Sequence, residues 1–97
     1  MGAYAAEKIT IEDTPIGFSF DKIYEKNNRP QYAVIGVENA PIRFLLDGDL
    51  PTATTGTLVQ DGTFVTLEGE HDIREFRAIR EGAVSAAITV QYFNNLN

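Results

Sequence analysis

Apolar residues in this chain recur mainly at every second position, in short runs separated by turn-forming residues. The longest run spans Ser85 to Phe93, where Ala86, Ile88, Val90 and Tyr92 occupy alternate positions. Successive side chains of an extended strand point to opposite faces, so this pattern is typical of a β-strand with one buried face. Runs with helical periodicity are scarce. The sequence therefore predicts an all-β protein.

Breaks that contain glycine, proline, asparagine or aspartate divide the chain into candidate strands. The candidates are Lys8–Glu12, Ile16–Phe20, Gln31–Glu38, Ile42–Asp47, Thr57–Gln60, Thr63–Glu68, a segment that ends at Arg80, and Ser85–Phe93. We expect a compact, jelly-roll-like β-sandwich or barrel of six to seven short, mainly antiparallel strands with one short helical turn. Since 97 residues supply one modest core, residues 7–97 are expected to form a single domain, and residues 1–6 either a frayed end or an extended arm.

Two local patterns say more about particular strands. The segment Gln31–Glu38 has apolar residues on both of its faces, which is typical of a central strand that is covered on each side. The dipeptide Asp61-Gly62 is preferred in two-residue turns, because both positions need a positive φ that Asp and Gly tolerate. We therefore predict a β-hairpin formed by the strands on either side of Asp61-Gly62.

The segment between His71 and Arg80 has a different period. Ile73, Phe76 and Ile79 recur at every third position, which predicts a helical turn over Asp72–Phe76, followed by a strand. The six phenylalanines of the chain fall mostly on the alternating strand faces, so we expect them in the core. These residues are Phe18, Phe20, Phe44, Phe64, Phe76 and Phe93.

Composition excludes several classes of function. The chain has no cysteine, so disulfides, thiolate nucleophiles and zinc ribbons are ruled out. A net charge of −6 repels nucleic acid, and the one basic run, Arg74, Arg77 and Arg80, is interleaved with glutamates. No apolar run reaches the roughly 18 residues of a membrane span. We therefore expect no nucleic-acid or membrane partner.

Candidate catalytic groups are few. His71 is flanked by acidic residues in a polar segment, and Ser19 and Ser85 are the only serines, so a solvated histidine is the simpler interpretation. Asp47-Gly48-Asp49 lacks the alternating oxygen ligands of a calcium loop and is better explained as a turn. We expect no enzyme activity, no cofactor and no metal, with a cation between acidic loops of an assembly as the open alternative.

The segment from Leu58 to Phe93 resembles a group of small structural proteins of bacteriophage virions. The likeness covers a little over a third of the chain and carries no catalytic signature. In that group, a hairpin leads to a Leu-Glu-Gly step, then to a phenylalanine-arginine strand and a closing strand that ends in tyrosine or phenylalanine. The matching residues here are Leu67-Glu68-Gly69, Ile73, Phe76 to Arg80, and Val90 to Phe93.

The resemblance implies a capsid decoration or cement protein, which is assembled in the host cytoplasm and lies on the capsid surface of the virion. Its partner would be the major capsid protein or another virion protein, and its state a homo-oligomer, as a dimer or trimer. Alternatives are a tail, baseplate or head-to-tail accessory protein, or a small carbohydrate- or receptor-binding module. Loops on a rigid scaffold usually carry recognition, so the expected interface lies in the arm and the long loops. Its residues are Tyr4, Tyr24, Asn27, Asn28, Arg29, Asp49, Thr52, Thr54 and Thr55.

Overall fold

The computed structural model describes residues 3–23 and 30–93, which form seven strands and two short helices. In chain order these are β1 (Ala5–Ile11), α1 (Phe20–Ile23), β2 (Tyr32–Glu38), β3 (Ile42–Leu45), β4 (Thr57–Val59), β5 (Phe64–Glu68), α2 (Glu70–Glu75), β6 (Arg77–Arg80) and β7 (Ala86–Phe93). Neither helix is long or apolar enough to cross a membrane.

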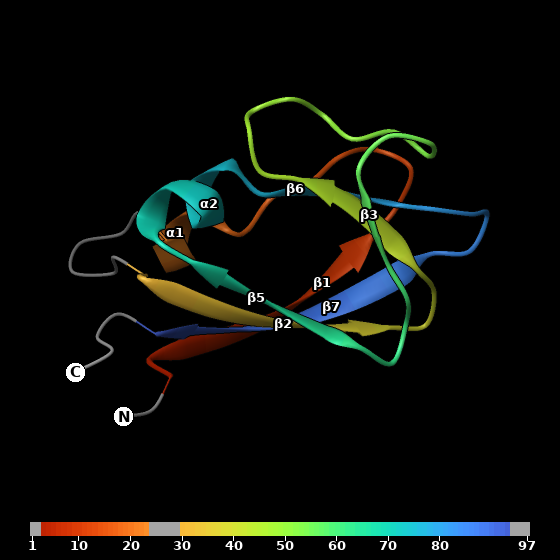
Figure 1. Cartoon of the computed structure of the whole chain (residues 1–97). Helices are drawn as coiled ribbons and strands as arrows, with labels where there is room; N and C mark the ends of the chain where they lie inside the picture. Colours follow the sequence, from red (N-terminus) through yellow and green to blue (C-terminus); the bar gives the residue numbers. More distant parts are fainter. Residues whose placement is uncertain (1–2, 24–29, 94–97) are drawn as a thin grey trace.

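The strands form two antiparallel sheets that face each other as a sandwich (Figure 1). The larger sheet has the order β1-β7-β2-β5, and the smaller one has the order β4-β3-β6. The two sheets do not close into a barrel. The predicted all-β class and the sandwich arrangement are confirmed.

The core lies between the sheets and centres on β7. Ala86, Ile88, Val90 and Tyr92 are all fully buried, as the alternation in this strand predicts. Aromatic rings fill the space at one end of the core. The ring of Phe76 stacks on that of Phe18 with centroids 4.5 Å apart, and on that of Phe44 at 5.5 Å, while Phe18 meets Tyr92 edge-on at 5.5 Å.

The predicted strand Ile16–Phe20 is wrong. Only Ile16 pairs with another strand, through two backbone hydrogen bonds to Ala78 of β6 at 2.9 and 3.0 Å. Phe18 inserts into the core, and Phe20 begins α1. The chain passes close to Phe76 just before Phe18, since a Cβ atom on Gly17 would lie 2.9 Å from the carbonyl oxygen of Phe76. Phe18 is buried but Ile16 is 40% exposed, so the apolar alternation does not mark the buried face of a strand here.

The predicted hairpin at Asp61-Gly62 is also wrong, although the chain does turn there. β4 pairs with β3 in the smaller sheet, and β5 pairs with β2 in the larger one, so the turn connects the two layers. Gly62 has a φ of 86°, and its N–H donates to the carbonyl oxygen of Val37 at 2.8 Å. Asn39 is the only non-glycine residue with a positive φ in the described part of the chain, so Asp61 does not adopt the conformation that a type I′ turn needs.

β2 is a central strand, as predicted, because it lies between β7 and β5. It is not covered on both sides, however. Ala33, Ile35 and Val37 are buried against the smaller sheet, whereas Tyr32 and Val34 are only half-buried on the opposite face. The other boundaries differ by a few residues, and the predicted helical turn corresponds to α2.

Candidate functional site

The expected interface residues fall into three groups. Tyr24, Asn27, Asn28 and Arg29 lie outside the described residues. Tyr4 precedes β1, and its hydroxyl donates a hydrogen bond to the carbonyl oxygen of Lys22 at 2.8 Å. The predicted arm therefore overlaps the sheet, because Ala5 and Ala6 belong to β1 and the N–H of Tyr4 donates to Tyr92 at 2.8 Å.

The third group lies in the loop between β3 and β4. Asp49, Thr52, Thr54 and Thr55 are exposed there, and the loop is held by Arg43 of β3. The Arg43 side chain donates from Nε to the carbonyl oxygen of Ala53 at 3.0 Å and from Nη1 to that of Gly56 at 2.9 Å.

Tyr4 and this loop do not form one site. The loop passes over the smaller sheet, whereas the N-terminal end of β1 belongs to the larger sheet in the other layer (Figure 1). Whether either of them contacts a partner stays a prediction. A different surface is formed by residues that share one face of the larger sheet.

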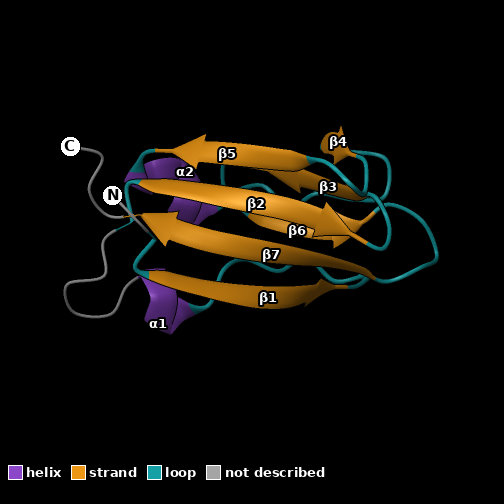
Figure 2. Cartoon of the chain, turned by 90° about the horizontal axis from the view of Figure 1, so that it is seen from below, coloured by secondary structure: helices purple, strands orange, loops and turns teal. Residues whose placement is uncertain are grey.

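This surface, which we call the outer sheet face, is the side of the larger sheet that points away from the core. No element of the described chain lies in front of it (Figure 2). The pairing register places its side chains in cross-strand rows, for example Thr66, Val34, Gln91 and Ala6. Its other members are Lys8, Thr10, Tyr32, Gly36, Glu38, Phe64, Glu68, Ala87, Thr89 and Phe93.

The centre of the outer sheet face is uncharged. Its only charged members are Glu68 and the pair formed by Lys8 and Glu38, whose charged atoms lie 3.3 Å apart. Thr89 donates to the same Glu38 carboxylate at 3.3 Å. An uncharged centre with charged residues at the margin resembles the composition of a protein–protein interface more than that of an average surface.

Phe64 is the most exposed large apolar residue of this face, with 71% of its surface accessible. It lies directly across from Gly36, which has no side chain to cover the ring. The expectation that Phe64 belongs to the core is therefore wrong, and Phe93 is only half-buried. The sequence held a signal for Phe64, because alternation within Thr63–Glu68 places it on the same face as Thr66 and Glu68.

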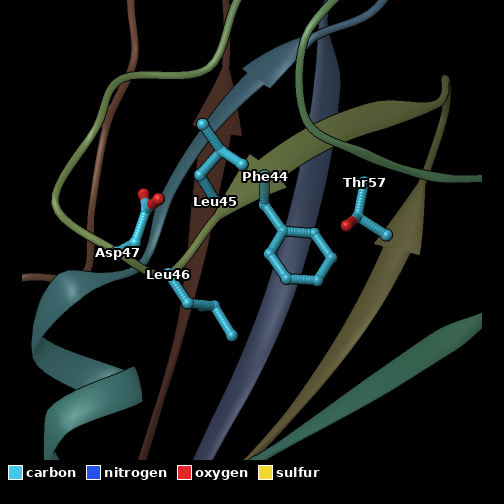
Figure 3. A pocket seen from close by; sticks show the side chains of 5 residues that line it. All are labelled: Phe44, Leu45, Leu46, Asp47 and Thr57. Carbon is cyan, nitrogen blue, oxygen red and sulfur yellow. The ribbon is translucent and has the colours of Figure 1, made fainter.

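A small open pocket of about 380 Å³ lies where β3 ends. It is lined by Phe44, Leu45, Leu46, Asp47 and Thr57, with Phe44 and Leu46 pointing to the same side of the strand (Figure 3). One carboxylate and one hydroxyl are few polar groups with which to orient a substrate. The lining of the pocket is therefore mainly apolar.

Among the described residues, the phenol of Tyr92 has the pKa that departs most from its usual value, and it belongs to a cluster around Glu7. The Glu7 carboxylate accepts hydrogen bonds from the hydroxyls of Tyr92 and Ser19 and, at 3.2 Å, from the backbone N–H of Ser19. Burial, and secondarily the hydrogen bond and negative charge of Glu7, raise the pKa of the Tyr92 phenol well above its usual value. The cluster joins the segment after β1 to β1 and β7, so its geometry explains a structural role.

The other candidate catalytic groups lie apart from one another. Ser19 donates to Glu7 and Ser85 donates to Glu12, while Nδ1 of His71 lies 3.4 Å from an oxygen of Asp72 on an exposed surface. Within residues 3–23 and 30–93, no three acidic or histidine side chains are grouped closely enough to hold a metal ion.

Comparisons of the chain with protein-family models, with curated proteins and with solved structures find no match.

Proposed function

We propose that this chain is a structural domain that binds other proteins without catalysis, and that its outer sheet face is the binding surface. The single observation that supports this most is the uncovered, largely uncharged outer sheet face with Phe64 exposed on it. An uncovered sheet face that carries few charges and an exposed phenylalanine has the composition of a surface that contacts a partner.

The physical reason lies in the surface that a partner would remove from water. Burying a phenylalanine side chain stabilises a complex by about 1.5–3 kcal/mol, and aromatic residues are enriched at the centres of interfaces. The neighbouring side chains, such as Val34, Thr66 and Ala87, are short, so a partner can approach the sheet closely.

The more specific form of the proposal is a bacteriophage capsid decoration protein that contacts the major capsid protein. It is supported by the resemblance of Leu58 to Phe93 to small virion proteins. One physical property of the chain agrees with this role, since its net charge of −6 disfavours contact with packaged DNA. On a particle, many identical weak contacts would add up through avidity.

Capsid binding with a matched pair of variants tests the proposal. Gln91→Arg places a large charged side chain at the centre of the outer sheet face, whereas Gln60→Arg makes the same change at an exposed position between β4 and β5. We expect the parent chain and Gln60→Arg to co-sediment with purified capsids, and Gln91→Arg to bind about tenfold more weakly or not at all.

Two outcomes would contradict the proposal. If the parent chain does not bind capsids, the decoration role is wrong. If Gln91→Arg binds as well as Gln60→Arg does, the outer sheet face is not the binding surface. Immunogold labelling of intact virions separates a position on the capsid from one on the tail.

A further inference from the structure

The strand β5 forms one edge of the larger sheet, and its hydrogen-bonding pattern shows which groups face outward. The N–H of Val37 donates to the carbonyl oxygen of Thr63 at 2.9 Å, and the N–H of Gly69 donates to that of Gln31 at 2.8 Å. In an antiparallel pair, alternate residues direct both backbone groups to the partner strand. The odd-numbered residues of β5 therefore bond to β2, and Phe64, Thr66 and Glu68 direct their N–H and C=O groups away from the sheet.

These outward groups have no strand beside them in the described part of the chain. β5 has β2 as its one neighbour in the sheet order, and no backbone hydrogen bond between described residues involves Phe64, Thr66 or Glu68 on the outward side. Thr66 and Glu68 are exposed, as is Phe64. The edge thus presents three donors and three acceptors in the spacing that a further strand requires.

The other sheet edges carry features that block pairing. β1 has Lys8 on its outer side and an inward-pointing glutamate, Glu7, that is bonded to Ser19. β6 is covered by Ile16 and by Glu12, whose carbonyl oxygen accepts from the N–H of Arg80 at 2.9 Å. β4 is only three residues long.

β5 has fewer of these protections, since Glu68 at its end is its one charged residue. Its sequence is Phe-Val-Thr-Leu-Glu, without lysine or proline, and it pairs with β2 residue for residue without a bulge. Natural proteins usually protect an exposed edge of this kind against association. An edge strand with so few protections is therefore open to pairing with another strand.

We propose that this strand is β5 of a second copy, paired antiparallel across a twofold axis. The dimer would contain one continuous sheet with four strands from each copy, and the two outer sheet faces would become one surface. The dimer does not depend on the proposed function, because its contacts involve only β5 of the two copies and no other partner.

The directions of the backbone groups limit the register, because outward groups meet outward groups only when even-numbered residues lie opposite even-numbered residues. Of these registers, the one that pairs all three outward residues places Thr66 opposite Thr66 of the second copy, and Phe64 opposite Glu68 of the second copy. This arrangement makes three bonded pairs with about six hydrogen bonds. It also keeps the two Glu68 carboxylates about four residues, or roughly 13 Å, apart, which is beyond the screening length of about 8 Å at physiological salt. A chain with a net charge of −6 can associate in this register without placing acidic side chains opposite one another.

Sedimentation equilibrium of the isolated full chain tests the dimer without any capsid. We expect the parent chain to sediment at twice its 10.7 kDa mass. Phe64→Glu places two glutamates opposite each other at two symmetric positions, so we expect the dimer dissociation constant to rise about tenfold or more. The double variant Phe64→Glu/Glu68→Lys turns both positions into opposite-charge pairs and should restore the dimer.

A second variant tests the hydrogen bonds. Thr66→Pro removes an N–H that points outward, so it should abolish the dimer while the pairing of β5 with β2 is kept. The matched control for Phe64→Glu is Leu58→Glu, which introduces the same charge at an exposed apolar position of the smaller sheet and should leave the dimer intact. Circular dichroism checks that each variant is folded.

The inference is wrong if the folded parent chain is a monomer or a trimer at all accessible concentrations. It is also wrong if the folded Phe64→Glu or Thr66→Pro variant dimerises like the parent. If Phe64→Glu dissociates and the double variant does not recover, the twofold register is wrong. Failure of capsid binding with an intact dimer contradicts the proposed function alone, and capsid binding by a monomeric parent contradicts the dimer alone.

Discussion

Tyr92 is completely buried, yet it makes a side-chain hydrogen bond. Its ring packs against other aromatic rings, and its hydroxyl donates to the Glu7 carboxylate. The raised pKa of the phenol has a consequence for stability at alkaline pH. The unfolded chain releases the phenolic proton near pH 10, whereas the folded chain retains it. The stabilisation from this group is therefore complete below about pH 10 and is lost as the pH rises further.

Tyr92→Phe tests this linkage. We expect the variant to lose about 1.5–3 kcal/mol at neutral pH, because a hydrogen bond to a charged acceptor disappears. Above about pH 10, the free energy of unfolding of the parent should fall more steeply than that of the variant, by about 1.4 kcal/mol per pH unit. Urea denaturation between neutral pH and pH 11 measures both effects.

Ser19→Ala is the control for the alkaline slope. It removes a different hydrogen bond to Glu7 but no phenol, so its stability should decline with pH as the parent's does. Equal alkaline slopes for the parent and Tyr92→Phe would show that Tyr92 does not cause the loss.

Among the elements, the loop between β3 and β4 shows how one side chain organises a long irregular segment. Arg43 bonds two carbonyl oxygens of the loop, and Pro51 within the loop is buried. Asp47 and Asp49 are exposed in the same loop, so the peptide bonds before them are sites for cleavage by an aspartate-specific protease when the loop opens.

Arg43→Met keeps the apolar stem and removes both hydrogen bonds. We expect the free energy of unfolding to fall by about 1–3 kcal/mol, and cleavage by endoproteinase Asp-N before Asp47 and Asp49 to become several-fold faster through local opening. Arg80→Met is the control, because it removes only a surface ion pair with Glu12, worth about 0–1 kcal/mol. Equal cleavage rates in the two variants, followed by mass spectrometry, would mean that Arg43 does not hold the loop.

At the scale of the whole molecule, the two sheets are held together by a mostly aliphatic core with a cluster of aromatic rings, in a chain without cysteine. Phe76 is 1% exposed and stacks on the rings of Phe18 and Phe44, whereas Phe64 is exposed on the outer sheet face. One phenylalanine therefore stabilises the core, while the other is exposed on the surface.

Phe76→Ala should lower the free energy of unfolding by about 3–5 kcal/mol, through lost burial and the cavity left behind. A domain of this size has about 5–15 kcal/mol in total, so the variant should unfold at much lower urea concentration. Phe64→Ala, measured at a concentration at which the chain is monomeric, should change stability by less than about 0.5 kcal/mol. Comparable losses in both variants would contradict the assignment of Phe76 to the core and Phe64 to the surface.

The sequence by itself determined the β-class and several strands, because alternation of apolar residues is a local consequence of burying one face of an extended chain. β7, β5 and most of β2 follow this pattern, and α2 follows a three-residue period. For the expected interface, the sequence supplied candidate residues but no arrangement, and the structure places Tyr4 and the Thr52–Thr55 loop in different layers.

Only the tertiary structure decided which strands pair and which faces stay open. The dipeptide Asp61-Gly62 indicates that the chain turns, but the partners of β4 and β5 are chosen by contacts far away in the sequence. The alternation at Ile16 to Phe20 likewise leads to one isolated bridge, at Ile16, and not to a strand. The tendency of a side chain to be buried depends on its own polarity. Strand pairing, and whether a side chain such as Phe64 is in fact covered, depend on which other segments reach the same place. That information lies in the packing of the whole chain.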